Sequence, residues 1–263
     1  MMLLQNARWP ALKDLASRIF VLPLGSLEQH GPHLPLFTDS LIISHIAEKV
    51  ESVRSDGIVM LPVQWLGHSP HHRRLGSVSL DLMPYAEMIR GVCRSLIQIG
   101  ARKIFLLNGH GGNDIPCKAA QRELKSEFEE LRDLYIVYAA YWSLAAAGFT
   151  EIRTSPPGGM GHACEMETSI LLAENPALVD MNLAERGGPG PHMGYRVTDM
   201  LHPLPFHMIN EFDEVSHNGV IGMPEHATAE KGSRFLEAAA LAAVALIDEM
   251  DQWKFQEKGP AIP

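Results

Sequence analysis

Residues 18–40 read RIFVLPLGSLEQHGPHLPLFTDS, and the order of features in this stretch decides the predicted fold. Residues 18–24 are mainly aliphatic and aromatic, which is typical of a strand buried inside a sheet. A helix is predicted over 39–53, with the Thr38, Asp39 and Ser40 cluster as its N-cap. The loop between the two carries glutamate and histidine, so a functional site is expected where the strand ends.

The rest of the chain repeats this alternation of short apolar runs and longer helical patterns. Further strands are predicted at 57–66, 103–107 and 134–141, and further helices at 82–99, 114–131, 162–174 and 227–250. Pro62 predicts a bend or bulge within the second strand. Strands that alternate with helices form βαβ units and a mostly parallel sheet. Because no repeat or linker interrupts the pattern, residues 1–263 are predicted to form a single α/β domain.

Composition places the chain among globular proteins and excludes several partners. Hydrophobic residues make up 46% and charged residues 20% of the 263 residues, which is enough apolar material for a sizeable core. The net charge is -9 and no basic stripe stands out, which argues against a nucleic-acid partner. The longest apolar run, at 238–247, is about half of the roughly 20 residues that a membrane helix needs. The N-terminus lacks a signal-peptide pattern, so we expect a cytoplasmic protein without a membrane partner.

Histidine is frequent, with 13 residues, and several of these directly follow the predicted strands. Three strand ends run into GSLEQHGPH at 25–33, GHSPHH at 67–72 and NGHGGN at 108–113. Because the carboxyl ends of parallel strands share one edge, where open α/β folds bind ligands, these loops should meet. Glu28 and His30 are two apart and would point to one side of an extended backbone. Asp39 follows at the helix start, and glycines around His110 allow close approach to an ion or a substrate.

Residues 161–169, GHACEMETS, add a carboxylate from a predicted helix. On that helix His162 and Glu165 share one face, whereas Glu167 is rotated from Glu165 by about 200°. Only one of the two glutamates can therefore reach the same point, and Glu165 is chosen. The predicted metal ligands are Glu28, His30, Asp39, His110 and Glu165.

Five nitrogen and oxygen donors exceed what a single catalytic zinc ion requires. They predict a pair of divalent ions roughly 3.5–4 Å apart. Zn²⁺ is the first choice, and Mn²⁺ or Fe²⁺ fit the same donors because the three dispersed cysteines offer no sulfur ligand. Taken singly, Asp39 could be only a helix cap, His110 a turn residue and Glu165 a solvated residue. Their joint place on several sheet-edge loops favours the metal site.

The other polar residues of these motifs are assigned to substrate binding and catalysis. Ser69, His71, Gly111 and His162 are predicted to contact the substrate, and His162 and Glu165 to be catalytic. An alternative interpretation is that His68, His71 and His72 form an exposed rim, because two arginines follow them.

Three further residues are open to a functional or a purely structural interpretation. Cys164 is interpreted as a buried apolar residue, because adjacent helical positions point about 100° apart and it cannot share a face with His162. Trp65 and Trp142 lie at strand ends and are candidates either for a pocket wall or for the core.

The blocks LPLGSLEQHGPHLPLFTD at 22–39, LLNGHGGN at 106–113, GHACEMETS at 161–169 and GVIGMPEHATAEKG at 219–232 together resemble the creatininase family of metal-dependent amidohydrolases. The resemblance implies a three-layer α/β/α sandwich with a dinuclear metal site at the carboxyl ends of the strands. It also implies hydrolysis of a non-peptide or cyclic amide bond and a homo-oligomer, commonly a hexamer. Under it, Asp39 would bridge the two ions and His162 would face the substrate.

The sequence departs from creatinine-hydrolysing members at two positions. Those members carry a glutamate ligand two residues after the histidine of the NGH block, where this chain has Gly112. They also carry a tryptophan four residues before the equivalent of His162, where this chain has Gly158. Glu165 is the candidate for the missing carboxylate. The NGHGGN form is similar to the branch with a formamidopyrimidine deformylase and a peptidase that trims a redox-cofactor precursor.

The predicted function is metal-dependent hydrolysis of an amide C–N bond in a small polar molecule. A water that bridges two ions can lose a proton near pH 7, and the resulting hydroxide would attack the carbonyl carbon. His162 would then donate a proton to the departing nitrogen. Two alternatives remain open: a peptidase or deformylase that acts on a modified peptide or a formamide precursor, and a non-catalytic metal-dependent binding subunit.

Overall fold

The computed structural model describes residues 2–13, 15, 17–188, 199–202 and 208–254. Its centre is a five-stranded sheet in the order β1–β4–β2–β6–β7, with every neighbouring pair parallel. The strands are β1 (Met2–Leu3), β2 (Ile19–Leu24), β4 (Ile58–Met60), β6 (Lys103–Asn108) and β7 (Tyr135–Ala140). The predicted parallel α/β sheet is thereby confirmed.

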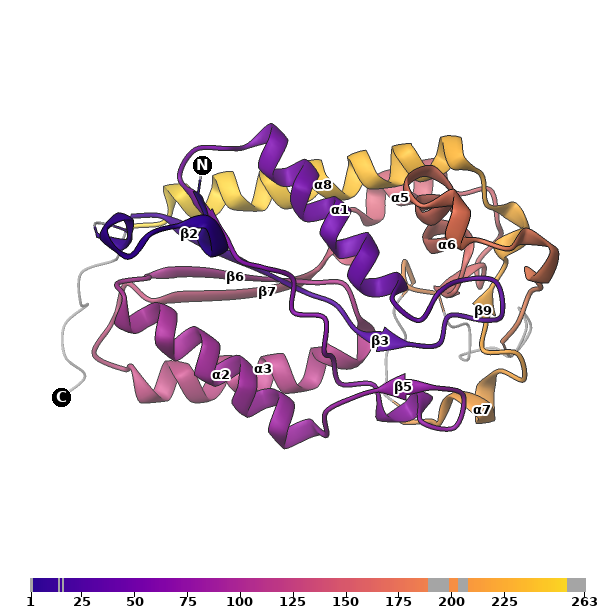
Figure 1. Ribbon diagram of the computed structural model, residues 1–263, viewed down its shortest axis with the longest axis horizontal. Coiled ribbons are helices and arrows are strands. Elements are labelled where there is room, and N and C mark those ends of the chain that lie inside the picture. The colour runs from indigo at the N-terminus through magenta and orange to yellow at the C-terminus, as the bar shows by residue number, and fades with distance from the viewer. Residues whose placement is uncertain (1, 14, 16, 189–198, 203–207, 255–263) are drawn as a thin grey trace.

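Helices cover both faces of this sheet and make three layers (Figure 1). One face carries α1 (Thr38–Val53) and α8 (Ala229–Gln252), and the other carries α2 (Leu82–Gln98) and α3 (Asp114–Glu127). Because side chains alternate along a strand, β2 serves both layers. Ile19 and Val21 pack into the core under α1 and α8, whereas Phe20 and Leu22 pack into the core under α2 and α3. Burial on both faces explains why this strand is a continuous apolar run.

The remaining elements are short, and many of them follow the carboxyl ends of the sheet strands. They include the antiparallel pairs β3 (Leu27–Glu28) with β5 (Ser77–Val78) and β8 (Met160–His162) with β9 (Ile221–Gly222). Short α-helices are α4 (Tyr141–Leu144), α5 (Ala146–Ile152), α6 (Glu165–Glu174) and α7 (Phe212–Val215). The 3₁₀ turns are η1 (Leu4–Asn6), η2 (Trp9–Leu12), η3 (Pro70–His72), η4 (Gly111–Asn113), η5 (Pro176–Leu178), η6 (Met181–Leu183) and η8 (Pro224–His226).

Pro62 bends the chain as predicted. Strand β4 ends at Met60, and Gln64 returns to the sheet as an isolated bridge to Leu24, with its N–H donating to the carbonyl of Pro23 at 2.9 Å. Because proline has no N–H to donate, the ladder is interrupted at this position. The strand predicted over 57–66 is therefore a short strand followed by a bend.

Two helix starts differ from the prediction. The N-cap of α1 is Phe37 and makes no side-chain cap, so the predicted capping by Thr38, Asp39 and Ser40 is wrong. Helix α6 begins at Glu165, because Ala163 has a φ of +50° and Cys164 is extended. His162 therefore belongs to strand β8, and the helix predicted over 162–174 starts three residues too early.

The cysteines form no disulfide among the described residues. Cys93, Cys117 and Cys164 are free thiols, and all three are buried. Cys164 lies within the core under α1 and α8, which confirms its interpretation as a buried apolar residue.

Among the residues that the structure describes, no helix combines the length and the hydropathy needed to cross a bilayer.

Candidate metal centre and active site

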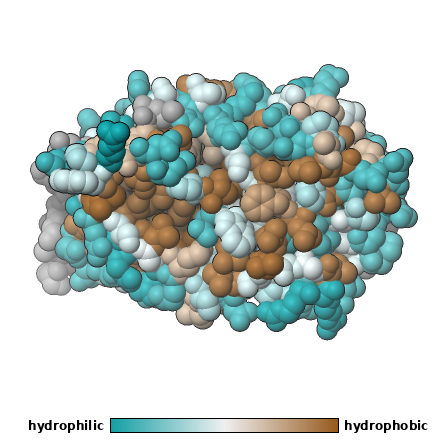
Figure 2. Space-filling view, in the orientation of Figure 1, coloured by the Kyte–Doolittle hydropathy of each residue, from teal (hydrophilic) through white to brown (hydrophobic). Residues whose placement is uncertain are grey.

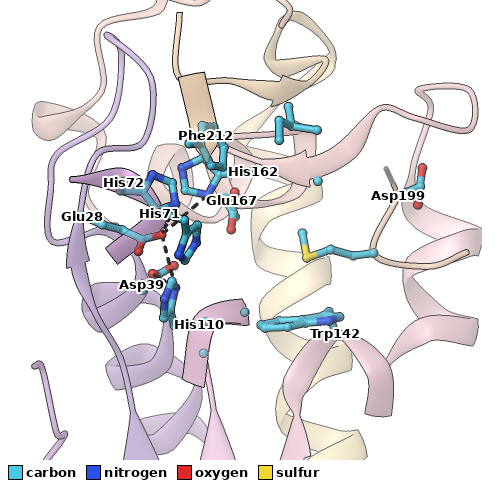
Figure 3. Close-up of a pocket in the computed structure, with 16 residues that line it drawn as sticks. Glu28, Asp39, His71, His72, His110, Trp142, His162, Glu167, Asp199 and Phe212 are labelled. Carbon is cyan, nitrogen blue, oxygen red and sulfur yellow. Dashed lines mark ion pairs between the residues drawn. The ribbon is translucent and has the colours of Figure 1, made fainter. Parts of the chain in front are cut away.

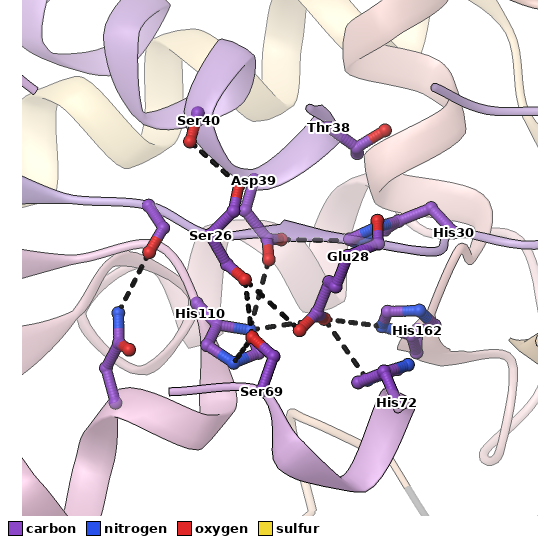
Figure 4. A network of polar contacts seen from close by, with 12 residues as sticks. Ser26, Glu28, His30, Thr38, Asp39, Ser40, Ser69, His72, His110 and His162 are labelled. Atoms are coloured by element: carbon purple, nitrogen blue, oxygen red, sulfur yellow. Dashed lines mark hydrogen bonds and ion pairs between the residues drawn. The ribbon is translucent and has the colours of Figure 1, made fainter. Parts of the chain in front are cut away.

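A cluster of carboxylates and imidazoles lies at the carboxyl edge of the sheet (Figure 4). Glu28 ends strand β3, His30 follows it, and Asp39 lies in the first turn of α1. His110 comes directly after β6, and Glu167 lies in the first turn of α6. All five side chains are buried. Four of the predicted donors, Glu28, His30, Asp39 and His110, are thus brought together after the strand ends, as the parallel topology requires.

Asp39 is at the centre of this cluster. Its Oδ1 lies 3.1 Å from Nε2 of His30, and its Oδ2 lies 3.0 Å from Nδ1 of His110. Glu28 Oε1 is 3.2 Å from the same nitrogen of His110, and Glu167 Oε1 is 4.0 Å from Nε2 of His30. Among the described residues the donor atoms form four groups, and two of these, Glu28–Asp39–His110 and His30–Asp39–Glu167, share Asp39.

The imidazoles of this cluster are oriented by bonds to their outer nitrogens. His30 Nδ1 is 3.2 Å from the carbonyl oxygen of Glu28, and His110 Nε2 is 3.1 Å from the carbonyl oxygen of His68. Because a carbonyl can only accept, these nitrogens carry the proton in the neutral ring and the inner nitrogens present a lone pair. This is the orientation that outer partners impose on metal-binding histidines.

The cluster fits a pair of divalent cations on three grounds. Its donors are imidazole nitrogens and carboxylate oxygens, the set that Zn²⁺, Mn²⁺ and Fe²⁺ share. Asp39 Oδ2 is buried and has no hydrogen-bond donor of acceptable geometry. Such an orphaned oxygen is rare in a folded protein unless an ion or a water satisfies it. The two oxygens of Asp39 also face different donor groups, as a bridging carboxylate would.

The pKa values show how strongly this cluster attracts positive charge. Burial alone lowers the pKa of His30, but Asp39 and the two glutamates raise it to about 9. Burial likewise opposes the charged form of His110, yet Glu28 and Asp39 hold its pKa well above the usual value. Burial raises the pKa of Glu167 to about 7. In the metal-free protein, the protonated imidazoles of His30 and His110 therefore balance the carboxylate charge that metal ions would otherwise balance.

Glu165 does not belong to the cluster, and its prediction as metal ligand and catalytic carboxylate is wrong. Its Oε1 accepts from Nζ of Lys231 at 2.5 Å and from the N–H of Thr154 at 2.9 Å, and its Oε2 accepts from the N–H of Ser155. The carboxylate is therefore already satisfied. Glu167 takes the predicted place, because α6 begins at Glu165 and turns its third residue toward His30.

The loop at 67–72 also differs from its prediction as an exposed rim. His72 is 1% exposed, with Nε2 at 3.2 Å from Glu28 Oε1 and Nδ1 at 2.9 Å from Nε2 of Gln29. Ser69 is fully buried, and its hydroxyl lies 3.1 Å from His110 Nε2, on the outer side of that ring. Ser69 does not line the pocket and supports His110 from behind, so its predicted substrate contact stays a prediction.

A pocket of about 290 Å³ opens above the cluster (Figure 3). Three predicted substrate contacts, His71, Gly111 and His162, line it, and Trp142 forms part of the opposite wall. Met200 and Ile221 add apolar surface to the pocket and Asp199 adds a carboxylate, whereas Phe212 packs on the rings of His72 and His162. Trp65 does not line the pocket and is 43% exposed.

The two ring nitrogens of His162 have different surroundings. Its Nε2 lies 2.7 Å from the carbonyl oxygen of Gln29, and its Nδ1 lies 3.8 Å from Oε1 of Glu28. The ring packs against His30, with 4.1 Å between centroids, and against Phe212 at 4.7 Å. Burial and the neighbouring imidazoles hold the pKa of His162 well below its usual value. The ring is therefore neutral, with the proton on Nε2 and the lone pair on Nδ1.

Sequence reasoning missed several residues of this site. Gln29, His72, Glu167, Asp199 and Phe212 all contact the cluster or line the pocket. Two of them had a sequence signal: Glu167 is the alternative to Glu165 in the same motif, and His72 belongs to the strand-end block GHSPHH. Asp199 is placed by its pairing with Arg153, whose Nη1 lies 2.9 Å from Asp199 Oδ2, a contact that no sequence spacing indicates.

The fold and the donor set define an α/β protein with a candidate metal-binding pocket at the sheet edge. The sequence profile of the creatininase family, described as creatinine amidohydrolase, matches residues 5–247. This chain belongs to the creatininase family of hydrolases.

Individual relatives differ in what they are described as cleaving. The chain is 31% identical over 227 residues to the mycofactocin precursor peptide peptidase of Mycobacterium tuberculosis (strain ATCC 25618 / H37Rv), covering 83% of this chain and 80% of that protein. It is 35% identical over 179 residues to the 2-amino-5-formylamino-6-ribosylaminopyrimidin-4(3H)-one 5'-monophosphate deformylase of Methanobrevibacter ruminantium, covering 67% and 69%.

Solved structures share the fold. The crystal structure of a creatinine amidohydrolase has a TM-score of 0.80 at 22% identity, covering 96% of this chain and 99% of that one. A structure described as "Creatininase Mn" has a TM-score of 0.74 at 25% identity, covering 94% and 98%.

Proposed function

We propose that this protein is a dinuclear metal-dependent hydrolase that cleaves an amide C–N bond in a small polar molecule. The observation that carries the proposal is the place of Asp39, whose two carboxylate oxygens face two separate donor groups beneath one pocket. His162 lies in the same pocket with a free nitrogen.

One ion would be held by Glu28, Asp39 and His110, and the second by His30, Asp39 and Glu167. Manganese in a solved creatininase supports a divalent ion, and the donor set also suits Zn²⁺ and Fe²⁺. Bound there, the ions would supply Lewis-acid chemistry, polarising an amide carbonyl and lowering the pKa of water toward about 7.

His162 would carry the proton of the reaction. Because Nε2 donates to the carbonyl of Gln29, only Nδ1 can accept a proton, and this atom lies beside Glu28. A neutral ring can take a proton at Nδ1 from the attacking water and return it to the departing nitrogen. The bond that breaks is the amide C–N bond, and the proton ends on the released amine.

Two glycines argue against creatinine as the substrate. A Cβ at Gly112 would lie 2.0 Å from the carbonyl oxygen of His68, so no side chain fits there without movement of the loop. Gly158 has a φ of +93°, a conformation that disfavours any other residue. The positions at which creatinine-hydrolysing members would contribute a glutamate and a tryptophan therefore carry no side chain in this protein.

A peptidase or deformylase is the second candidate, and the identities of the two named relatives favour it. The NGHGGN motif supports the same branch of the family. The residues that line the pocket fit this candidate too, because Trp142, Met200 and Ile221 offer an apolar surface for a larger group beside the scissile amide.

Purified protein reloaded with Zn²⁺ or Mn²⁺ should be tested on cyclic amides, formamides and peptides, with mass spectrometry of the products. We expect C–N cleavage that disappears on chelation and in Asp39→Asn. Release of formate or of a terminal peptide fragment would select the second candidate. Full metal loading and tight ligand binding without turnover would instead show a binding subunit and overturn the proposal.

We also propose a cytoplasmic homo-oligomer, with a hexamer as the state that the family resemblance implies. Large apolar side chains are exposed over β3, β5 and the start of α1, among them Phe37, Trp65 and Val78 at 38%, 43% and 52%. Figure 2 shows a broad hydrophobic area in this region. Areas of this kind mark protein contacts. Light scattering of the purified protein tests the proposal, and a monomer would contradict it.

A further inference from the structure

We infer that His71 is a further ligand of the ion that Glu28, Asp39 and His110 would hold. The inference rests on the proposed dinuclear site and assigns to His71 a metal contact in place of a substrate contact. His71 lies in turn η3 and lines the pocket. Figure 3 shows its ring pointing toward Asp39 and His110, between the arms of the cluster.

His71 lies close to one ligand of the cluster, Glu28. One of its ring nitrogens lies within 4.8 Å of donor atoms of Glu28 and His72. Its ring is stacked on His110, with 5.8 Å between centroids and 11° between planes. Glu28 is common to this group and to the group Glu28–Asp39–His110, so a movement of the His71 side chain toward Glu28 would bring its nitrogen to the same ion.

The surroundings of Gly112 explain why His71 can occupy this place. An ideal Cβ at Gly112 would lie 3.0 Å from Cε1 of His71 and 2.5 Å from Nε2 of His110. A side chain from turn η4 is therefore excluded, and the imidazole of His71 fills the space beside His110. With Glu28, Asp39 and His110 as three ligands and a water as the fourth, His71 would complete a five-coordinate ion, a number that catalytic zinc sites can reach.

His71 also differs from its neighbours in its hydrogen bonding. His30, His72, His110 and His162 each have a ring nitrogen bonded to a protein atom. Within the ranges that the structure describes, the ring of His71 has no such partner, so both nitrogens are free for a ligand.

The turn that carries His71 is nevertheless well fixed. The N–H of Ser69 donates to Oγ of Ser79 at 2.7 Å, and Oγ of Ser77 donates to the carbonyl of Ser69 at 3.1 Å. His72, the next residue, is buried against Glu28. The backbone that carries His71 is thus fixed before an ion binds, and the stacking of its ring on His110 helps to set the direction of the side chain.

The test compares His71→Ala with His68→Ala in metal-stripped, full-length protein titrated with Co²⁺. His68 is a matched control, because it is in the same loop, lies outside the pocket lining and bonds through Nδ1 to the carbonyl of Leu80 at 3.0 Å. Its own carbonyl, which contacts His110, remains in the alanine variant. The readouts are stoichiometry, affinity and the visible absorption of the bound Co²⁺.

We expect wild type and His68→Ala to bind two ions with the same spectrum. His71→Ala should bind one of the two at least about 10-fold more weakly, with altered Co²⁺ absorption. Added imidazole should restore both, which a merely structural effect would not allow. Circular dichroism checks that each variant is folded.

If His71→Ala binds two Co²⁺ ions with wild-type affinity and an unchanged spectrum, the inference is overturned. If the only change in that variant is a rise in KM, His71 contacts the substrate and not the metal. Wild-type protein that binds fewer than two ions would instead overturn the proposed dinuclear site itself. The two failures are therefore distinguishable.

Discussion

Oδ2 of Asp39 lies 3.0 Å from Nδ1 of His110, although the two residues follow different strands of the sheet. Strands β2 and β6 pair in parallel from Ile19 with Lys103 to Leu24 with Asn108, so their loops leave the sheet together. The contact between a helix-start carboxylate and a strand-end imidazole is thus set by the sheet register, and it gives the cluster its centre.

Exchanging the two glutamates of α6 for glutamine separates their roles. Glu167→Gln should lose one of two ions and retain the fold, because it removes a donor beside His30. Glu165→Gln should keep both ions but lose stability on the order of 3 kcal/mol, since Lys231 would be left buried without its counter-ion. Elemental analysis and chemical denaturation measure the two effects, and metal loss in Glu165→Gln would contradict the assignment.

Replacing His162 tests its role in proton transfer. His162→Ala should keep both ions and lower kcat by roughly 10²–10⁴-fold, the usual contribution of a positioned acid or base. His45→Ala is a suitable control, because His45 is bonded to Asn175, outside the pocket. Unchanged turnover in His162→Ala would remove this residue from the reaction.

Metal affinity should rise between pH 6 and pH 9. A bound ion must displace the proton of His30, whose pKa is raised to about 9, and that of Glu167, whose pKa is raised to about 7. Binding therefore releases protons and is favoured as their concentration falls. Isothermal titration in buffers of different ionisation enthalpy counts the released protons, and pH-independent affinity would count against the cluster as the binding site.

Stability of the metal-free protein should change in the opposite direction. The pKa of His30 is raised above its ordinary value of 6.5, so its stabilising contribution is complete below pH 6.5 and is lost as the pH approaches 9. Ionisation of the buried Glu167 through pH 7 acts in the same sense. Thermal melts at pH 6.5 and pH 9 should differ by several degrees without metal. The metal-loaded protein should show a smaller difference, and equal changes in both forms would contradict this explanation.

The sheet and half of the site could be predicted because their signals are local. Apolar runs such as 19–24 become strands buried on both faces, and the residues directly after them must share an edge. Glu28, Asp39 and His110 therefore follow from the order of elements alone.

The remainder depends on backbone details and on tertiary contacts that the sequence does not display. The positive φ of Ala163 separates His162 from α6, and this reverses which glutamate faces the cluster. His72 looks like a rim residue in sequence because two arginines follow it, yet the turn buries its ring against Glu28. Gln29 orients His162 through its backbone carbonyl, for which side-chain identity gives no signal.

Anomalous diffraction from crystals of the protein loaded with Zn²⁺ or Mn²⁺ tests the central claim most directly. We predict two peaks on either side of the Asp39 carboxylate, one within bonding distance of Glu28 and His110 and the other within bonding distance of His30 and Glu167. A single peak, or peaks that do not share Asp39 as a ligand, would contradict a bridged pair of ions.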